Sequence, residues 1–225
     1  MFEQQLAMID PRMLELLMDL GAIVKGHFVL ASGVHSEYYF NKDALYADPT
    51  TISEICLELA KQFVGKNIDV VVAPAVGGAI LTSRIAEHLG TLENRKIISI
   101  FADKGKDNDG NDIFIIKRGY DKFVPGKNIL IAEDVTTSTH GGSMSKVVNA
   151  VNELNGNIAG LSIICNRGGI TSANVGLDDN MPLYSWLELD IPTYPAEDCP
   201  LCAAGIPPNA DLGKGATFLA NQQKI

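Results

Sequence analysis

The chain has 225 residues, of which 46% are hydrophobic, so it can bury one sizeable core. Its formal net charge is −9, which argues against a general affinity for nucleic acid or anionic membrane, because both require a basic face. No apolar run approaches the ~20 residues that span a bilayer, and the N-terminus lacks a basic region followed by an apolar core. We therefore expect a single domain over residues 1–225, located in the cytoplasm.

The N-terminal part of the chain predicts short elements. Asp10 before Pro11 is typical of a helix start, and apolar residues follow at helical spacing until Gly21. Two β-type segments with aromatic residues come next, and a second amphipathic helix follows them. The predicted elements are a helix over 10–20, a short strand that leads into a turn over 26–33, a strand over 37–41, and a helix over about 49–63.

The middle of the chain alternates apolar runs of β type with helical stretches. This order predicts an α/β fold with a mostly parallel sheet and helices on both of its faces. Ligands of such sheets bind at the carboxyl ends of the strands, so the residues just after each strand are the candidate site residues. The polar stretch 103–112, between two apolar runs, predicts an exposed mobile loop. The predicted strands span 70–73, 97–101, 129–132 and 158–165, and the predicted helices span 79–89 and 143–154.

The segment 128–143 carries the most informative chemistry. An apolar strand delivers two adjacent carboxylates, Glu133 and Asp134, to the carboxyl edge, and a run of Thr, Ser and Gly then leads into a helix. Glycine N–H groups, hydroxyl donors and the helix N-terminus together predict an anion site without lysine. The carboxylates cannot bind phosphate, so they should face hydroxyl groups or a cation, and a ribose diol beside a 5′-phosphate meets both requirements. The strand-to-helix turn 73–79 predicts a second anion site on the same edge.

The segment 128–143 resembles the phosphoribosyl pyrophosphate signature of the type I phosphoribosyltransferases. The resemblance implies that family's α/β fold, with a central, mostly parallel sheet flanked by helices and a small hood formed by about residues 1–45 and part of the C-terminal tail. It also implies that the acidic pair contacts the ribose, that the following loop holds the 5′-phosphate, and that the turn 73–79 binds pyrophosphate. The loop after Asp134 is longer than the family's common form, so the contacts of residues 136–140 stay open. The residues assigned to phosphoribosyl pyrophosphate are Glu133, Asp134, Thr136, Thr137, Gly141, Gly142, Ser143, Val76, Gly77, Gly78 and Lys104.

Three further segments, 26–41, 165–169 and 198–207, resemble orotate phosphoribosyltransferases in particular. The first resembles the hood whose aromatic residues lie over the base, and the second places Arg167 where that subfamily has an arginine that recognises orotate. A guanidinium fork suits a planar base that bears a carboxylate. Aromatic residues at strand spacing also suit a hydrophobic core, so that alternative stays open for Tyr38, Tyr39 and Phe40. The residues assigned to orotate are Arg167, Tyr38, Tyr39 and Thr137.

The family carries a mobile lid whose lysines reach the pyrophosphate, often from a neighbouring subunit. Lys104 and Lys106 match these lysines in kind, and the resemblance implies catalytic roles for both and for Asp134. Lys117 and Arg118, after the next apolar run, could compensate for three departures from the family's pattern. The positions where orotate enzymes frequently have arginine and histidine are occupied by Asp103, Asn108 and Asp109.

The resemblance implies Mg²⁺ as cofactor, held mainly by phosphoribosyl pyrophosphate, with Asp134 as the one possible protein ligand. It implies transfer of phosphoribosyl to orotate, which gives orotidine 5′-phosphate and pyrophosphate in pyrimidine nucleotide biosynthesis, by a homodimer without nucleic-acid or membrane partners. The alternatives are a phosphoribosyltransferase for a purine or uracil, and a non-catalytic regulator that binds phosphoribosyl pyrophosphate. A dinucleotide-binding dehydrogenase is disfavoured, because no G-x-G-x-x-G follows the first sheet strand.

Four cysteines are too few for a disulfide framework in a chain of this length, and they suit a reducing compartment. Cys199 and Cys202 have CxxC spacing, but no second CxxC completes a zinc site, so a metal role is the less favoured interpretation. The histidines show no metal-binding spacing; they are His27, His35, His88 and His140. The role of the cysteine pair stays open.

Overall fold

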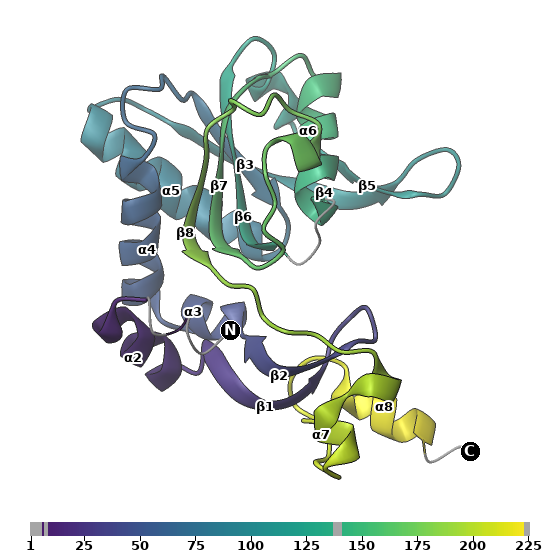
Figure 1. Cartoon of the computed structure of the whole chain (residues 1–225). Coiled ribbons are helices and arrows are strands. Elements are labelled where there is room, and N and C mark those ends of the chain that lie inside the picture. The colour runs from purple at the N-terminus through teal and green to yellow at the C-terminus, as the bar shows by residue number, and fades with distance from the viewer. Residues whose placement is uncertain (1–5, 7–8, 137–140, 223–225) are drawn as a thin grey trace. The chain divides into compact units, whose positions relative to one another are not determined.

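The chain folds into two compact units, which Figure 1 shows in a computed structural model that describes residue 6 and residues 9–136 and 141–222. We call them the hood unit, which combines Met1–Ala47 with Asp190–Ile225, and the sheet unit, which comprises Asp48–Leu189. The two ends of the chain therefore belong to the same unit.

The hood unit is built on an antiparallel pair of strands, β1 and β2. Asp10 accepts hydrogen bonds from the backbone N–H groups of Arg12 (2.9 Å) and Met13 (3.3 Å), which confirms the predicted helix start. The C-terminal segment joins the hairpin where the N–H of Lys214 donates to the carbonyl of Val29 at 2.7 Å. The elements of this unit are α2 (Pro11–Asp19), β1 (Ile23–Val29), β2 (His35–Phe40), α3 (Lys42–Ala47), η3 (Ala196–Asp198), α7 (Pro200–Ala203) and α8 (Gly215–Gln222).

The sheet unit contains a six-stranded sheet in the order β5-β4-β3-β6-β7-β8. Every neighbouring pair is parallel except β4 and β5, which are antiparallel. The predicted mostly parallel α/β sheet is therefore confirmed. Its strands are β3 (Val70–Pro74), β4 (Ile98–Lys106), β5 (Asp112–Ile115), β6 (Asn128–Thr136), β7 (Asn157–Asn166) and β8 (Leu183–Glu188).

Helices cover both faces of the sheet, with α4 and α5 on one face and α6 on the other (Figure 1). Asp48 begins α4 by accepting from the N–H groups of Thr50 (2.9 Å) and Thr51 (3.3 Å). The unit's helices are α4 (Pro49–Lys61), α5 (Gly77–Glu93), η1 (Asp121–Phe123), α6 (Gly142–Glu153) and η2 (Ala173–Val175).

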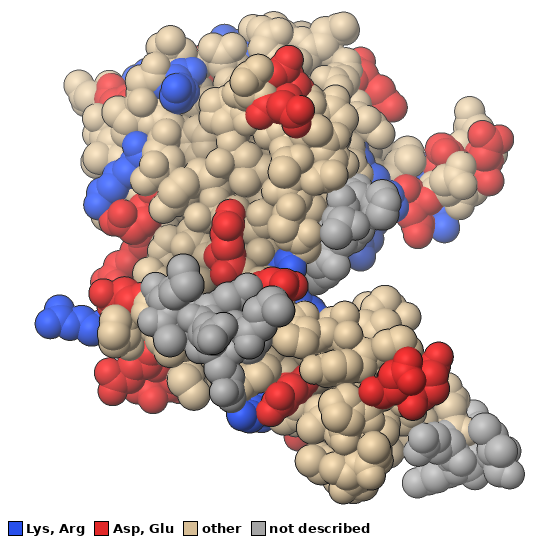
Figure 2. All heavy atoms as spheres, viewed as in Figure 1, with Lys and Arg blue, Asp and Glu red and all other residues tan. Residues whose placement is uncertain are grey.

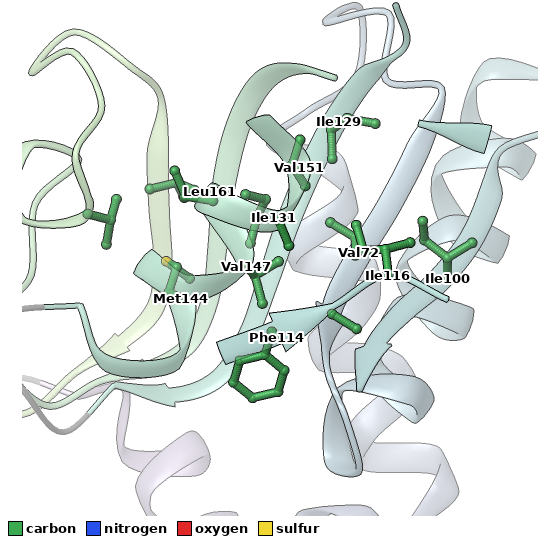
Figure 3. Close-up of a cluster of buried hydrophobic side chains, with 14 of the residues drawn as sticks. Val72, Ile100, Phe114, Ile116, Ile129, Ile131, Met144, Val147, Val151 and Leu161 are labelled. Atoms are coloured by element: carbon green, nitrogen blue, oxygen red, sulfur yellow. The ribbon is translucent and has the colours of Figure 1, made fainter. Parts of the chain in front are cut away.

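The core on the α6 side determines where that helix lies. Met144, Val147 and Val151 of α6 point toward Ile131 and Leu161 on the strands, and all five side chains are fully buried (Figure 3). Alternate residues of a strand face the same side of the sheet, so the strands present a continuous apolar surface to the helix. This packing holds the first turn of α6 at the carboxyl end of β6.

The prediction of a loop over residues 103–112 is wrong for part of that stretch. Residues 103–106 continue strand β4, and Asp112 begins β5, so that only 107–111 form the turn of a β-hairpin. The charged residues gave no strand signal in the sequence. An edge hairpin can expose polar side chains while its backbone groups still form the hydrogen bonds between the two strands. Within the hairpin, a Cβ atom on Gly105 would lie 2.4 Å from Ile115 Cδ1, so a side chain at this position would require the exposed Ile115 side chain to move.

Charged side chains are distributed over the surface of both units. Figure 2 shows acidic residues on each unit in the face it presents, with basic residues between them. This agrees with the net charge of −9. Among the described residues, no helix has the length and apolar character needed to cross a membrane.

Candidate active site

Three neighbouring parallel strands of the sheet unit, β3, β6 and β7, end at the same edge. The turn after β3 leads into α5, the segment after β6 leads to α6, and β7 is followed directly by Arg167. Parallel topology therefore brings together three of the segments selected from the sequence. Open α/β sheets bind their ligands at this edge.

Glu133 and Asp134 lie near the end of β6, and both are buried. The hydroxyl of Ser143, in the first turn of α6, donates to Glu133 Oε2, and the N–H of Asp134 donates to Glu133 Oε1 at 3.2 Å. The N–H of Val135 donates to Asp134 Oδ1 at 2.8 Å. Burial raises the pKa of Glu133 to about 8, and the neighbouring Asp134 charge acts in the same direction. The pair therefore favours a ligand that brings hydroxyl donors or positive charge.

Both helices that begin at this edge lack a side-chain cap. Helix α5 starts after Val76, which is 86% exposed, and α6 starts after Gly141, which has φ 75°. The backbone N–H groups of a first helical turn have no partner within the helix, and the helix dipole makes this end partially positive. Each helix start is thus suited to bind an anionic group.

Two glycines allow the close packing that these helix starts require. A Cβ atom on Gly78 would lie 2.6 Å from Ala73 Cβ, and one on Gly141 would lie 2.5 Å from Val175 Cγ1. The peptide bond between Ala75 and Val76 is cis. At Gly78, then, the close approach of α5 to β3 leaves no room for a side chain.

Asn166, the last residue of β7, was missed by the sequence analysis. Thr136 Oγ1 donates to Asn166 Oδ1 at 2.9 Å, and the Asn166 amide in turn bonds the backbone of Ile170, with distances of 3.0 and 3.1 Å. The N–H groups of Arg167 and Gly168 both donate to the Thr136 carbonyl at 3.1 Å. Asn166 thereby fixes the turn that carries Arg167 against the end of β6. A polar residue at the end of an apolar strand was the only signal for it.

The lysines of the predicted lid lie on the β4–β5 hairpin. Lys104 and Lys106 are exposed, and Lys106 Nζ lies 2.7 Å from Asp112 Oδ1. Arg118 donates to both carboxylate oxygens of Asp103, at 2.8 and 3.1 Å, and this hydrogen bonding holds the pKa of Asp103 below its usual range. Asp103, one of the positions that depart from the family's pattern, is thus paired with Arg118, and compensation for the acidic lid by Lys117 and Arg118 stays a prediction.

The remaining predicted residues divide between the two units. Tyr38 and Tyr39 belong to the hood unit, where Tyr38 is buried with Lys25 Nζ 5.4 Å from its ring centre, and Tyr39 packs on Phe28 at 5.3 Å. Thr137 lies outside the described residues, as do the neighbouring positions 138–140. The predicted residues at the carboxyl edge of the sheet unit are Val76, Gly77, Gly78, Glu133, Asp134, Thr136, Gly141, Gly142, Ser143 and Arg167.

Comparison with known proteins identifies the family. Residues 43–183 match the phosphoribosyl transferase domain family. The chain belongs to this family. The match coincides closely with the sheet unit, which carries the acidic pair and both uncapped helix starts. The type I phosphoribosyltransferase fold and the family predicted from residues 128–143 are therefore confirmed.

Relatives extend the similarity to the hood unit. An orotate phosphoribosyltransferase of Thermoanaerobacter sp. is 37% identical over 194 residues, which are 86% of this chain and 92% of that protein. One from Chlorobium phaeobacteroides is 32% identical over 216 residues, which are 96% of this chain and 100% of that protein. The resemblance to orotate phosphoribosyltransferases is thus confirmed over nearly the full length.

Solved structures confirm the fold without selecting a base. The orotate phosphoribosyltransferase of Aeropyrum pernix has a TM-score of 0.60 at 19% identity and covers 78% of this chain and 92% of its own. An adenine phosphoribosyltransferase of Rhodothermus marinus has a TM-score of 0.56 at 18% identity and covers 80% of this chain and 100% of its own. Enzymes for different bases share this fold, so the choice of base depends on particular residues.

Proposed function

We propose that this protein is an enzyme that transfers phosphoribosyl from phosphoribosyl pyrophosphate to orotate, which gives orotidine 5′-phosphate and pyrophosphate in pyrimidine nucleotide biosynthesis. The observation that carries the proposal is the buried pair Glu133 and Asp134 beside the uncapped start of α6. Relatives named orotate phosphoribosyltransferase at 32–37% identity support orotate as the base.

Phosphoribosyl pyrophosphate has two anionic ends and a diol between them, and the edge of the sheet offers a matching order of groups. The start of α6, with Gly141, Gly142 and Ser143, binds the 5′-phosphate. The acidic pair accepts hydrogen bonds from the ribose hydroxyls, and the turn from Val76 to Gly78 binds the pyrophosphate through backbone N–H groups. Thr137 supplies a hydroxyl donor to the same region, whereas the hydroxyl of Thr136, at the end of β6, donates to Asn166 Oδ1.

Mg²⁺ fits the donor set of this site. Hard divalent cations prefer carboxylate and phosphate oxygens, and Mg²⁺ commonly binds through one or two carboxylates plus substrate phosphates. Asp134, beside the buried Glu133, is the protein residue that would contact it, while most of its ligands come from the substrate. When bound, the ion neutralises charge on the leaving pyrophosphate.

Orotate is planar and bears a carboxylate, which the Arg167 guanidinium can bind through two parallel hydrogen bonds. Asn166 and the two N–H bonds to the Thr136 carbonyl hold the turn that carries this arginine. Tyr38, Tyr39 and Thr137 complete the base site in the proposal. Holding the base in this position raises the reaction rate, because the two substrates then react within one complex and do not have to meet by diffusion in the right orientation.

The reaction forms a bond from a ring nitrogen of orotate to C1′ and breaks the bond from C1′ to the pyrophosphate oxygen, which leaves with the electron pair. The ring nitrogen gives up its proton, which leaves with the pyrophosphate. Positive charge develops on the ribose in the transition state, so ionised carboxylates near the ribose favour it. Lys106 and Lys104 stabilise the leaving pyrophosphate when the hairpin approaches it. No side chain acts as a covalent nucleophile.

We further propose that the hood and sheet units act together as one phosphoribosyltransferase domain, that the chain is a cytoplasmic homodimer, and that neither nucleic acid nor membrane is a partner. The dimer is supported by the exposed side chains of Lys104 and Lys106 on the β4–β5 hairpin, since lid lysines of this family often serve a neighbouring subunit. The net charge of −9 supports the absence of nucleic-acid binding.

The base is tested by pyrophosphate release from phosphoribosyl pyrophosphate and Mg²⁺ with orotate, uracil or adenine as the acceptor. We expect release with orotate alone, and none from the double variant Glu133→Gln with Asp134→Asn, whose fold is checked by circular dichroism. Release with adenine or uracil but not orotate would replace the proposed base. Binding of phosphoribosyl pyrophosphate without release for any base would favour the regulator.

A further inference from the structure

Two histidines and two cysteines from opposite ends of the chain meet inside the hood unit. The nitrogen and sulfur atoms that can bind a metal all lie within 4.8 Å of one another. His27, His35 and Cys199 are buried, and Cys202 is exposed. No other group of three or more potential metal-binding side chains was found among the described residues. The cluster belongs to neither the acidic pair nor the lysine hairpin.

The distances within the cluster suit a tetrahedral ion. Zn–S bonds of about 2.3 Å and Zn–N bonds of about 2.0–2.1 Å place the ligand atoms of a tetrahedral site about 3.3–3.8 Å apart. Cys199 Sγ lies 3.7 Å and Cys202 Sγ 3.8 Å from His27 Nε2, and Cys202 Sγ lies 3.3 Å from His35 Nδ1. The two ring nitrogens, 2.8 Å apart, would have to separate by about 0.5 Å, and the widest pair of ligand atoms, up to 4.8 Å apart, would have to approach by about 1 Å.

A hydrogen bond outside the cluster prepares His27 as a ligand. Its Nδ1 lies 2.6 Å from the carbonyl oxygen of Ile206, and because a carbonyl can only accept, Nδ1 carries the proton. The neutral ring then presents the lone pair of Nε2 to the two cysteines. Metal-binding histidines commonly donate their other N–H to a carbonyl or carboxylate in this way.

Backbone pairing brings the four residues together. His35 exchanges two backbone hydrogen bonds with Tyr194, at 2.8 and 2.9 Å, and the N–H of Asn209 donates to the carbonyl of His27 at 2.7 Å. Cys199 precedes α7 and Cys202 lies within it, so the CxxC segment stands between these two attachment points. The pairing therefore holds the C-terminal segment against the β1–β2 hairpin on both sides of the cluster.

We propose that these four side chains bind one structural Zn²⁺ ion, which ties the C-terminal segment to the N-terminal hairpin. Imidazole and thiolate are the ligands that zinc prefers, and two of each complete a closed tetrahedral site with no open position for a substrate. A unit of this size buries a small core, and a bound metal adds stability that such a core lacks. None of these four residues is assigned to Mg²⁺ or substrate in the proposed reaction.

The test begins with the wild-type protein, prepared in reductant without a polyhistidine tag or a chelator. We expect elemental analysis to find about one zinc ion per chain. After the zinc is removed, Co²⁺ should restore the site with the intense visible bands of tetrahedral coordination and an ultraviolet band from cobalt–thiolate charge transfer. Less zinc than protein after reconstitution, together with a cobalt spectrum of octahedral type, would overturn the proposal.

Variants then assign the ligands. The double variant Cys199→Ser with Cys202→Ser should lose the zinc and the thiolate band, whereas Cys56→Ala and His88→Ala should keep both. The controls remove a thiol and an imidazole outside the cluster; Cys56 is buried in α4, and His88 Nε2 lies 2.9 Å from the Ser53 hydroxyl. Zinc retained by the double variant would contradict the assignment. A disulfide between Cys199 and Cys202 that persists in the wild-type protein in the presence of reductant would also contradict it.

These measurements do not depend on phosphoribosyl transfer, so they test the zinc site independently of the proposed function. If the double variant does not fold, metal content and the cobalt spectrum of the wild-type protein still decide the question. A protein that transfers phosphoribosyl but binds no zinc would refute the inference alone.

Discussion

At the scale of single residues, the protonation of Glu133 links the fold to the chemistry. Its carboxyl group is buried beside Asp134, and the two cannot both ionise without a cost in free energy. A ribose diol or a cation would reduce that cost by donating to the pair or neutralising it. A bound ligand can therefore stabilise the ionised form of both carboxylates.

Glu133→Gln should increase stability in a pH-dependent manner. The folded pKa of about 8 lies above the ordinary value of 4.5, so the stabilising contribution of the protonated group is fully present below pH 4.5 and is lost as the pH rises through 8. Glutamine mimics the protonated form at every pH. Denaturant unfolding should show similar stabilities near pH 4.5 and a gain for the variant on the order of 1–3 kcal/mol at pH 8.

The control for this measurement is Glu153→Gln, which changes an exposed glutamate on α6. It should shift stability by less than about 0.5 kcal/mol, without the same dependence on pH. A Glu133→Gln variant that is destabilised equally at both pH values would show that the ionised carboxylate has stabilising partners in the ligand-free protein.

At the scale of elements, the β4–β5 hairpin is the part whose charges bear most directly on turnover. Lys106 forms an exposed pair with Asp112, and such pairs contribute little to stability. Arg118 holds Asp103 in a two-point contact at the base of the same hairpin. The lysines can therefore leave their positions at small cost when a pyrophosphate is present.

Lys106→Ala should lower kcat about tenfold or more and change KM for orotate by less than about threefold, because the lysine acts on the leaving group and not on the base. Steady-state kinetics with both substrates measure this. The matched variant Asp112→Asn removes the partner and keeps the lysine, so it should retain or raise kcat. An unchanged kcat for Lys106→Ala would remove the proposed role.

The sequence predicted most elements of the sheet unit and missed the β4–β5 hairpin and strand β8. Apolar periodicity located β3, β6 and β7, because buried parallel strands are apolar on both faces. The end of β4 lacks the apolar alternation of a strand, because its exposed lysines alternate with an aspartate and a glycine. Asn166 was missed because its role depends on contacts with Thr136 and Ile170 that no local pattern contains.

At the scale of the whole molecule, the hood unit shows the limit of sequence reasoning most clearly. Cys199 and Cys202 were noticed as a pair, but their partners His27 and His35 stand at the other end of the chain. Spacing rules detect ligands that are close in sequence, whereas this cluster is assembled by the pairing of β2 with the C-terminal segment. The similarity of relatives over nearly the full length indicates that the hood unit belongs to the family's architecture.

The central claim is tested most directly by the ultraviolet absorbance of orotate after the intact protein is mixed with phosphoribosyl pyrophosphate, with and without Mg²⁺. The account predicts loss of the orotate signal that requires both the protein and the metal. No loss in the presence of Mg²⁺, from folded protein that still binds phosphoribosyl pyrophosphate, would contradict it.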